Sequence, residues 1–343
     1  MRRRGATVLL GAALLFLLVW QANSLQVPYV QVGPGPTVDT LGVSDNKPVI
    51  TVKGVPATKS AGQLRLVTVG ITKDLTLFDA LRGWLQDDYA VVPSEFYYPP
   101  GKTDAEVDQE HTEEFKESQT SAETAALRSL GYPVQVTVTE VAAGTPAAAG
   151  LTAGDIITSV DGAPVSSLST LNRLIRDKGV GAPRRLGITR AGAALTVTFT
   201  PGKAIDGAAN KVLEGATLES RQPHPFEITI DLDRIGGPSA GMMFALGIID
   251  TVDPVDLTGG LIIVGTGEID EDGNVGRIGG IPHKLVAARQ AGAKVFFTPA
   301  DNCAEALQHA QPGLPLVKVS TLDDALNALR ALREHRQPTL CTA

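Results

Sequence analysis

The feature that most limits how this chain can fold is a strand, a glycine-rich turn and an apolar helix in succession. Residues 226–232 alternate apolar and polar side chains, which predicts a strand with one buried face. The turn that follows contains Gly-Gly-Pro-Ser-Ala-Gly at residues 236–241. Residues 242–250 are almost entirely apolar and predict a buried helix. A strand that passes through a tight turn into a buried helix is typical of an α/β fold.

Ser239 lies in this turn, where its hydroxyl would be exposed beside backbone N–H groups at the start of a helix. Such N–H groups stabilise an oxyanion. A serine is a weak nucleophile until a base accepts its proton, and no histidine stands in a signature that identifies it as that base. Lys284 is the other candidate, because it lies at the start of a predicted helix. Burial and the helix dipole would lower the pKa of its amine towards neutrality there.

Three segments carry a resemblance to a known family. Residues 236–241 look like the serine motif of the Lon protease domain. Residues 265–288 look like the segment that supplies the Lon lysine, and residues 296–302 continue it. The likeness covers roughly residues 210–335 and implies an α/β fold with a Ser–Lys dyad.

The resemblance implies a role for each matching residue. Ser239 would be the nucleophile and Lys284 the base, and Thr266 would orient the lysine by a hydrogen bond. The turn around the serine would line the oxyanion hole and contact the substrate through Gly237, Pro238 and Ala240.

The sequence also departs from the family. Many Lon domains carry an acidic residue just before Gly-Pro-Ser, whereas Gly236 stands there in this chain. Lon proteases proper use ATP, but no Gly-x-x-x-x-Gly-Lys-Ser/Thr loop occurs in this sequence. We therefore expect no ATPase and no cofactor. The chain resembles the ATP-independent PDZ–Lon proteins of Gram-positive bacteria.

A second domain is predicted at residues 121–203, where short alternating strands surround turns rich in glycine. Residues 145–151, 153–157 and 160–162 resemble a PDZ domain of the bacterial protease-associated type. A PDZ-like fold implies that an extended peptide is captured by adding a strand to an exposed sheet edge. Use of this domain only as a spacer is the alternative.

The loop before the first strand of this domain lies where the PDZ family binds a terminal carboxylate. We predict that Gly131, Tyr132 and Val134 contact substrate there. The loop is not the usual Gly-Leu-Gly-Phe, and Pro133 has no N–H to offer a carboxylate. Selectivity for free C-termini is therefore left open.

The N-terminal sequence predicts a membrane-targeting segment. Three arginines at residues 2–4 precede an apolar run from Ala6 to Trp20, which is typical of a signal peptide or a signal anchor. Fifteen residues is short for a span, which needs about 20, but residues 21–30 add further apolar side chains. We expect an uncleaved single-pass helix in the bacterial plasma membrane, with the catalytic domain outside the cytoplasm. A cleaved signal peptide is the alternative.

The predicted architecture is therefore multidomain, of α/β and α+β class, in four consecutive parts. They are a transmembrane helix at residues 1–30, a small α+β segment of unknown role at 31–120, the PDZ-like domain at 121–203 and the Lon-like α/β domain at 204–343.

Composition excludes several other functions. The net charge of −7 provides no basic field for nucleic acid. Cys303 and Cys341 are too few for a disulfide framework or a zinc site, and we interpret them as ordinary thiols. Residues 270–274 hint at a calcium loop, but Val275 and Ile281 stand where that loop needs Gly and Glu. A hairpin turn explains this segment better, so we expect no metal site.

Three classes of function fit these observations. The first is a Ser–Lys endopeptidase that acts on protein or peptide substrates, as a homo-oligomer (a hexamer by the resemblance). The second is an esterase of the α/β-hydrolase type, because Gly237–Gly241 also fits a nucleophile elbow. The third is a peptide-binding protein that has lost catalysis.

Overall fold

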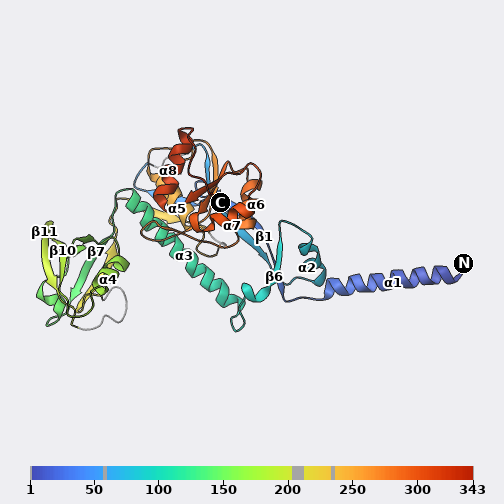
Figure 1. Cartoon of the computed structure of the whole chain (residues 1–343), viewed down its shortest axis with the longest axis horizontal. Coiled ribbons are helices and arrows are strands. Elements are labelled where there is room, and N and C mark those ends of the chain that lie inside the picture. The colour runs from blue at the N-terminus through green and yellow to red at the C-terminus, as the bar shows by residue number, and fades with distance from the viewer. Residues whose placement is uncertain (1, 57–59, 203–211, 233–235, 343) are drawn as a thin grey trace. The chain divides into compact units, whose positions relative to one another are not determined.

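The computed structural model describes residues 2–56, 60–202, 212–232 and 236–342 (Figure 1). The chain forms two compact units. The first consists of Met1–Ala122, Ile228–Asp270 and Asn274–Ala343, and the second of Glu123–Glu227 with Glu271–Gly273. The second unit is therefore inserted into the sequence of the first, so residues 31–122 fold together with the C-terminal third of the chain.

The first unit is built on a six-stranded mixed sheet in the order β18-β17-β14-β5-β1-β6. The pairs β5–β14, β14–β17 and β17–β18 are parallel, whereas β1 pairs antiparallel with both β5 and β6. The strands are β1 (Tyr29–Asp39), β5 (Gln63–Thr72), β6 (Ala90–Pro93), β14 (Ile262–Gly265), β17 (Val295–Pro299) and β18 (Leu316–Val319). The register Ile263↔Leu64 joins segments that lie far apart in the sequence.

Several helices pack on the strands of this unit. The first ten residues of α5 are all buried, in agreement with the apolar run after the serine turn. Thr321 caps α8 in a capping box with Asp324. The helices of this unit, apart from two described below, are α2 (Leu77–Trp84), α5 (Gly241–Val252), α6 (Ile281–Gln290), α7 (Cys303–Gln308) and α8 (Leu322–Arg333).

The short elements complete the first unit. β15 and β16 form the hairpin predicted at residues 270–274, where the N–H of Asn274 donates to Asp270 Oδ1. The bounds are β2 (Val43–Ser44), β3 (Lys47–Pro48), β4 (Ile50–Lys53), η1 (Ser94–Phe96), β13 (Glu227–Ile230), β15 (Glu268–Ile269), β16 (Val275–Gly276) and η4 (Ala300–Asn302).

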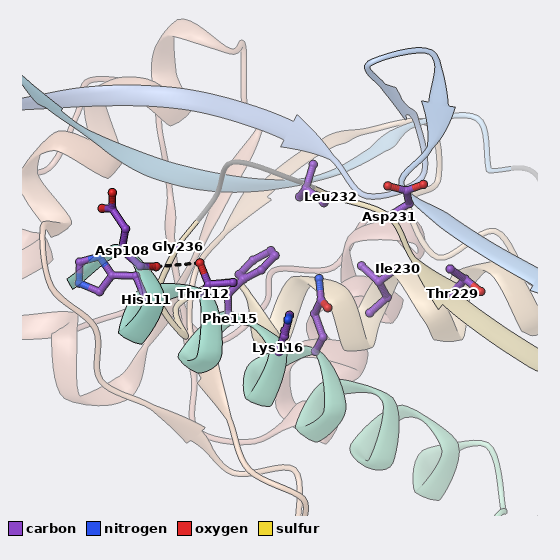
Figure 2. A pocket seen from close by; sticks show the side chains of 11 residues that line it. Asp108, His111, Thr112, Phe115, Lys116, Thr229, Ile230, Asp231, Leu232 and Gly236 are labelled. Atoms are coloured by element: carbon purple, nitrogen blue, oxygen red, sulfur yellow. Dashed lines mark hydrogen bonds between the residues drawn. The ribbon is translucent and has the colours of Figure 1, made fainter. Parts of the chain in front are cut away.

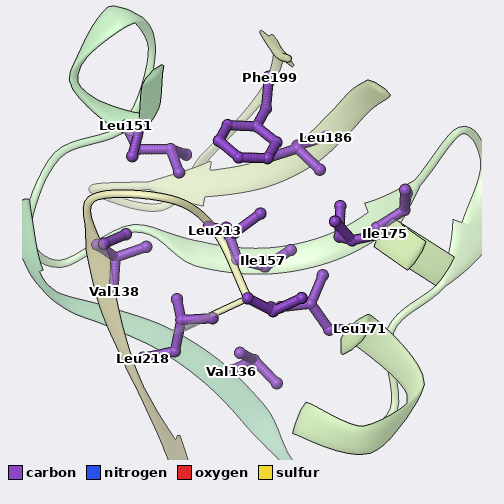
Figure 3. Close-up of a cluster of buried hydrophobic side chains, with 14 of the residues drawn as sticks. Val136, Val138, Leu151, Ile157, Leu171, Ile175, Leu186, Phe199, Leu213 and Leu218 are labelled. Atoms are coloured by element: carbon purple, nitrogen blue, oxygen red, sulfur yellow. The ribbon is translucent and has the colours of Figure 1, made fainter. Parts of the chain in front are cut away.

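The second unit is a sheet in the order β11-β10-β8-β7-β12 that is covered by α4. Figure 3 shows its core, in which Leu171 and Ile175 of α4 meet strand residues such as Leu218. The buried Asp155 is held by a two-point ion pair with Arg190 at 2.7 Å. The elements are β7 (Gln135–Val141), η2 (Pro146–Ala149), β8 (Ile156–Val160), β9 (Ala163–Pro164), α4 (Leu168–Arg176), β10 (Arg184–Arg190), β11 (Ala193–Phe199) and β12 (Ala216–Arg221).

One long helix, α3 (Asp104–Ser129), begins in the first unit and ends in the second. Its N-terminus is capped by Thr103, whose hydroxyl accepts from the N–H of Glu106. At its other end Gly131 adopts a φ of +89°, and the N–H of Tyr132 donates to Leu127. Glycine is suited to this position because it accepts a left-handed backbone at little cost.

The prediction of a transmembrane helix is wrong. The N-terminal segment forms the helix α1 (Arg2–Ser24), but none of the helices in the described residues is long and apolar enough to cross a bilayer. The apolar run of fifteen residues from Ala6 to Trp20 would extend about 22 Å as a helix, against about 30 Å of hydrocarbon. The expected single-pass localisation in the plasma membrane is overturned with it.

The interpretation of the two cysteines as ordinary thiols is also wrong. Cys303 and Cys341 form a disulfide, with their Cα atoms 5.3 Å apart. The C-terminal segment returns to the sheet, where the N–H of Cys341 donates to Leu316 at 2.9 Å. This pairing places Cys341 beside the start of α7, which sequence spacing alone did not indicate.

Candidate active site

A cavity of about 550 Å³ in the first unit is lined by both Ser239 and Lys284. Its walls come from segments that are distant in the sequence. The lining residues, besides Ser239 and Lys284, are Pro36 of β1, residues 67–69 and 71 of β5, Tyr97, His111 and Glu114 of α3, the rest of the turn 236–240, Glu268 and residues 278–280. The segment 31–120, to which the sequence assigned no chemistry, therefore contributes much of the wall.

Ser239 is held by its backbone in the turn before α5. Its carbonyl accepts hydrogen bonds from the N–H of Gly267 at 2.9 Å and from the hydroxyl of Thr266 at 3.0 Å. The serine is only partly buried, so its side chain remains accessible from the cavity.

Two hydrogen bonds from α3 hold the residues just before the serine. The N–H of Gly237 donates to the carbonyl of His111 at 3.0 Å. The hydroxyl of Ser118 donates to the carbonyl of Pro238 at 2.9 Å. The serine turn is thus fixed on one side by α3 and on the other by the segment that carries Thr266.

Lys284 is buried in the first turn of α6 and is only 3% exposed. Its Nζ donates to the hydroxyl of Thr266 at 3.0 Å, and Thr266 is fully buried. Burial lowers the pKa of the Lys284 amine from 10.5 to about 8, and the negative charge of Glu268 partly opposes that shift. A substantial fraction of this lysine is therefore neutral at mildly alkaline pH and can accept a proton.

Carboxyl groups also face the cavity. Burial raises the pKa of Glu268, the nearby charge of Glu114 raises it further, and Lys284 lowers it. No sequence motif marks either glutamate, His111 or Ser118. The residues 111, 114 and 118 are spaced as one face of a helix, which is the signal that could have indicated α3 as a wall of the site.

A second pocket, of about 520 Å³, lies between α3 and the strand region 229–232. Figure 2 shows Asp108, His111, Thr112 and Phe115 on the helix side. The pocket shares His111 and Gly236 with the cavity that contains Ser239. Open space therefore flanks the serine turn on more than one side.

In the second unit, the residues predicted to bind substrate have other partners. The N–H groups of Gly131 and Tyr132 donate to Arg128 and Leu127 at the end of α3. The ring of Tyr132 packs edge-on against His224 and Phe226. A carboxylate at this loop would have to displace both helix-capping hydrogen bonds.

Val134 is buried and leads directly into β7. That strand pairs with β8 on one side and with β12 on the other, so both of its edges are occupied by the chain itself. The edge strands of this sheet are β11 and β12.

Family comparisons match two separate regions of the chain. Residues 109–200 match a PDZ domain, and residues 234–331 match the C-terminal proteolytic domain of Lon protease (S16). The chain contains a PDZ domain and a Lon-type proteolytic domain.

Curated relatives are similar over part of their length only. Lon protease 2 of Bacillus subtilis is 32% identical over 128 residues, which is 36% of this chain and 22% of that protein. The periplasmic pH-dependent serine endoprotease DegQ of Escherichia coli is 34% identical over 133 residues, which is 36% of this chain and 29% of that protein. The chain thus spans less than a third of the length of either relative.

Among solved structures, the PDZ domain of the SdrC-like protein from Listeria monocytogenes is 30% identical. The match covers 24% of this chain and 85% of that chain, with a TM-score of 0.21.

Proposed function

We propose that this protein is an ATP-independent serine endopeptidase that hydrolyses peptide bonds in unfolded or flexible protein segments. Ser239 is the nucleophile and Lys284 is the general base. The observation that carries the proposal is a buried lysine, with a pKa of about 8, on the wall of the same cavity as a serine in a strand–turn–helix segment. The Lon-type domain match at residues 234–331 supports this assignment.

The chemistry proceeds by acyl transfer. The neutral amine of Lys284 accepts the proton of Ser239 while Oγ attacks the carbonyl carbon of the scissile peptide bond. The resulting ammonium then gives its proton to the leaving amine, and the C–N bond breaks to leave an acyl-enzyme. Water, deprotonated by the same lysine, hydrolyses the ester and restores the serine.

Thr266 orients the base in this proposal. Its hydroxyl accepts a hydrogen bond from Lys284 Nζ and donates one to the carbonyl of Ser239. One side chain therefore links the base to the backbone of the nucleophile. This contact also satisfies one N–H of a buried amine, which reduces the cost of keeping it out of water.

The oxyanion of the tetrahedral intermediate needs N–H donors. The N–H of Gly237 is bonded to His111, and Pro238 has none. Among the described residues 237–240, this leaves the N–H groups of Ser239 and Ala240 as donors. We assign the oxyanion hole to them.

The PDZ domain would engage substrate as an extended segment. Since β7 is paired on both sides, the edges open to strand addition are those of β11 and β12. The prediction for Gly131, Tyr132 and Val134 is tested by truncating Tyr132 to Ala and measuring the KM for long and short substrates.

The test uses the full chain and an unfolded casein substrate without ATP. Wild type is expected to cleave casein and to be labelled by a fluorophosphonate, whereas Ser239→Ala and Lys284→Met do neither. Lys294→Ala, which alters an exposed lysine, is the control and stays active. Equal cleavage by Lys284→Met would rule out the lysine as base, and casein left intact by wild type would rule out the peptidase.

A further inference from the structure

We propose that Ser118 is a positioning residue that sets the direction of the Ser239 N–H, and thereby forms the oxyanion hole. This inference rests on the proposed peptidase function. It concerns Ser118 on α3, which lies 120 positions in the sequence from Pro238.

The hydroxyl of Ser118 is held in place by burial. Ser118 is 5% exposed, and its Oγ donates to the carbonyl of Pro238 at 2.9 Å. The N–H of Gly241 also approaches that carbonyl, but at 3.4 Å, which is long for such a bond. Ser118 therefore provides the stronger of the two contacts to the Pro238 carbonyl.

The planarity of the peptide bond converts this contact into an effect on the next residue. In a trans peptide the C=O and the following N–H point in opposite directions, and every peptide bond described in the chain is trans. Because the Pro238 carbonyl points at Ser118, the N–H of Ser239 points away from Ser118. Pro238 and Ser239 line the catalytic cavity, whereas Ser118 does not. The two sides of this peptide plane therefore face different surroundings, and we assign the Ser239 N–H to the cavity side.

Each peptide plane next to Ser239 is thus held by a different element. The plane before it is held by Ser118 on α3, and the plane after it by Thr266 and Gly267, which both donate to the Ser239 carbonyl. This first plane rotates about ψ of Pro238 and φ of Ser239, and the proline ring restricts only the φ of Pro238. Of the two contacts to the Pro238 carbonyl, the hydroxyl of Ser118 is the shorter, and we assign to it the orientation of this plane.

The test compares Ser118→Ala with Thr120→Ala, which removes an exposed hydroxyl of α3 that bonds only within the helix. Rates are divided by the fraction of sites that a fluorophosphonate labels at saturation, so that unfolded protein does not count. We expect Ser118→Ala to lower kcat by about 10- to 100-fold with KM unchanged within about twofold. Its affinity for a peptide aldehyde, whose adduct carries the oxyanion, should fall by the same factor.

Ser118→Cys keeps a weak hydrogen-bond donor and should give a kcat between those of wild type and Ser118→Ala. If the alanine variant does not fold, the cysteine variant tests the role of Ser118. The inference is overturned if the normalised kcat of the folded Ser118 variants stays within about twofold of wild type, or if KM changes in place of kcat. These outcomes require an active wild type, so they are distinct from failure of the peptidase proposal, in which wild type itself neither cleaves nor is labelled.

Discussion

The pH dependence of cleavage is the sharpest consequence of the proposed role of the buried Lys284 as the base. An ordinary lysine with a pKa of 10.5 would be neutral in only about 0.03% of molecules at pH 7. With a pKa of about 8, the neutral fraction of Lys284 is about 10% at pH 7 and about half at pH 8. Burial therefore increases the fraction of competent base at pH 7 by about 300-fold.

The expected profile of kcat/KM follows from these fractions. Activity on a peptide without ionisable side chains should rise about tenfold per unit between pH 6 and 7, bend near pH 8 and level off above about pH 9. Glu268→Gln removes the negative charge that raises the pKa of Lys284, so the bend should move to lower pH and activity at pH 7 should increase. Glu117→Gln, on an exposed position of α3, is the matched control and should leave the bend in place.

The same shift has a consequence for stability. The folded protein holds Lys284 with a lowered pKa, so between about pH 8 and 10.5 the unfolded chain binds more protons, and stability rises with pH in that window. Below pH 8 the buried lysine is charged, and its burial lowers the free energy of unfolding by the full amount, on the order of 3 kcal/mol. Lys284→Met should therefore unfold at higher denaturant concentration than wild type at pH 7 while losing activity. A flat pH–rate profile, or a bend at pH 10 or above that Glu268→Gln leaves unmoved, would refute the reasoning.

Three further predictions concern other contacts. Thr266→Val, which keeps the shape but removes the hydroxyl between base and nucleophile, should lower kcat by about 10- to 100-fold, measured by steady-state cleavage, while Thr266→Ser retains most activity. Reduction of the Cys303–Cys341 disulfide, which closes a separation of 38 residues, should cost up to about 4 kcal/mol of unfolding free energy and lower the Tm; an unchanged Tm in dithiothreitol would contradict this. Arg190→Leu leaves the buried carboxylate of Asp155 without its ion partner and should destabilise the PDZ unit by about 3–5 kcal/mol in urea denaturation, an effect that Asp155→Asn in the same chain should partly relieve.

The sequence by itself determined the local parts of the candidate site. The strand–turn–helix pattern predicted that Ser239 lies in a tight turn. The pattern around Lys284 predicted that this residue lies at the start of a helix, which is α6. The hairpin at residues 270–274 and a separate sheet domain at residues 121–203 were predicted for the same reason. Each depends on side chains that are close along the chain, where periodicity and turn residues specify the backbone.

The tertiary structure decided which distant segments complete that site. The pairing of β5 with β14 and the contacts from His111 and Ser118 join residues more than 100 positions apart, and no local pattern encodes such a pairing. The lowered pKa of Lys284 likewise depends on burial by neighbours from several elements, because desolvation is a property of the surrounding volume and not of the adjacent sequence. Local sequence patterns therefore predict the nucleophile and the base of the proposed dyad, while long-range packing of residues 31–122 against the C-terminal third creates the buried environment that lowers the pKa of Lys284.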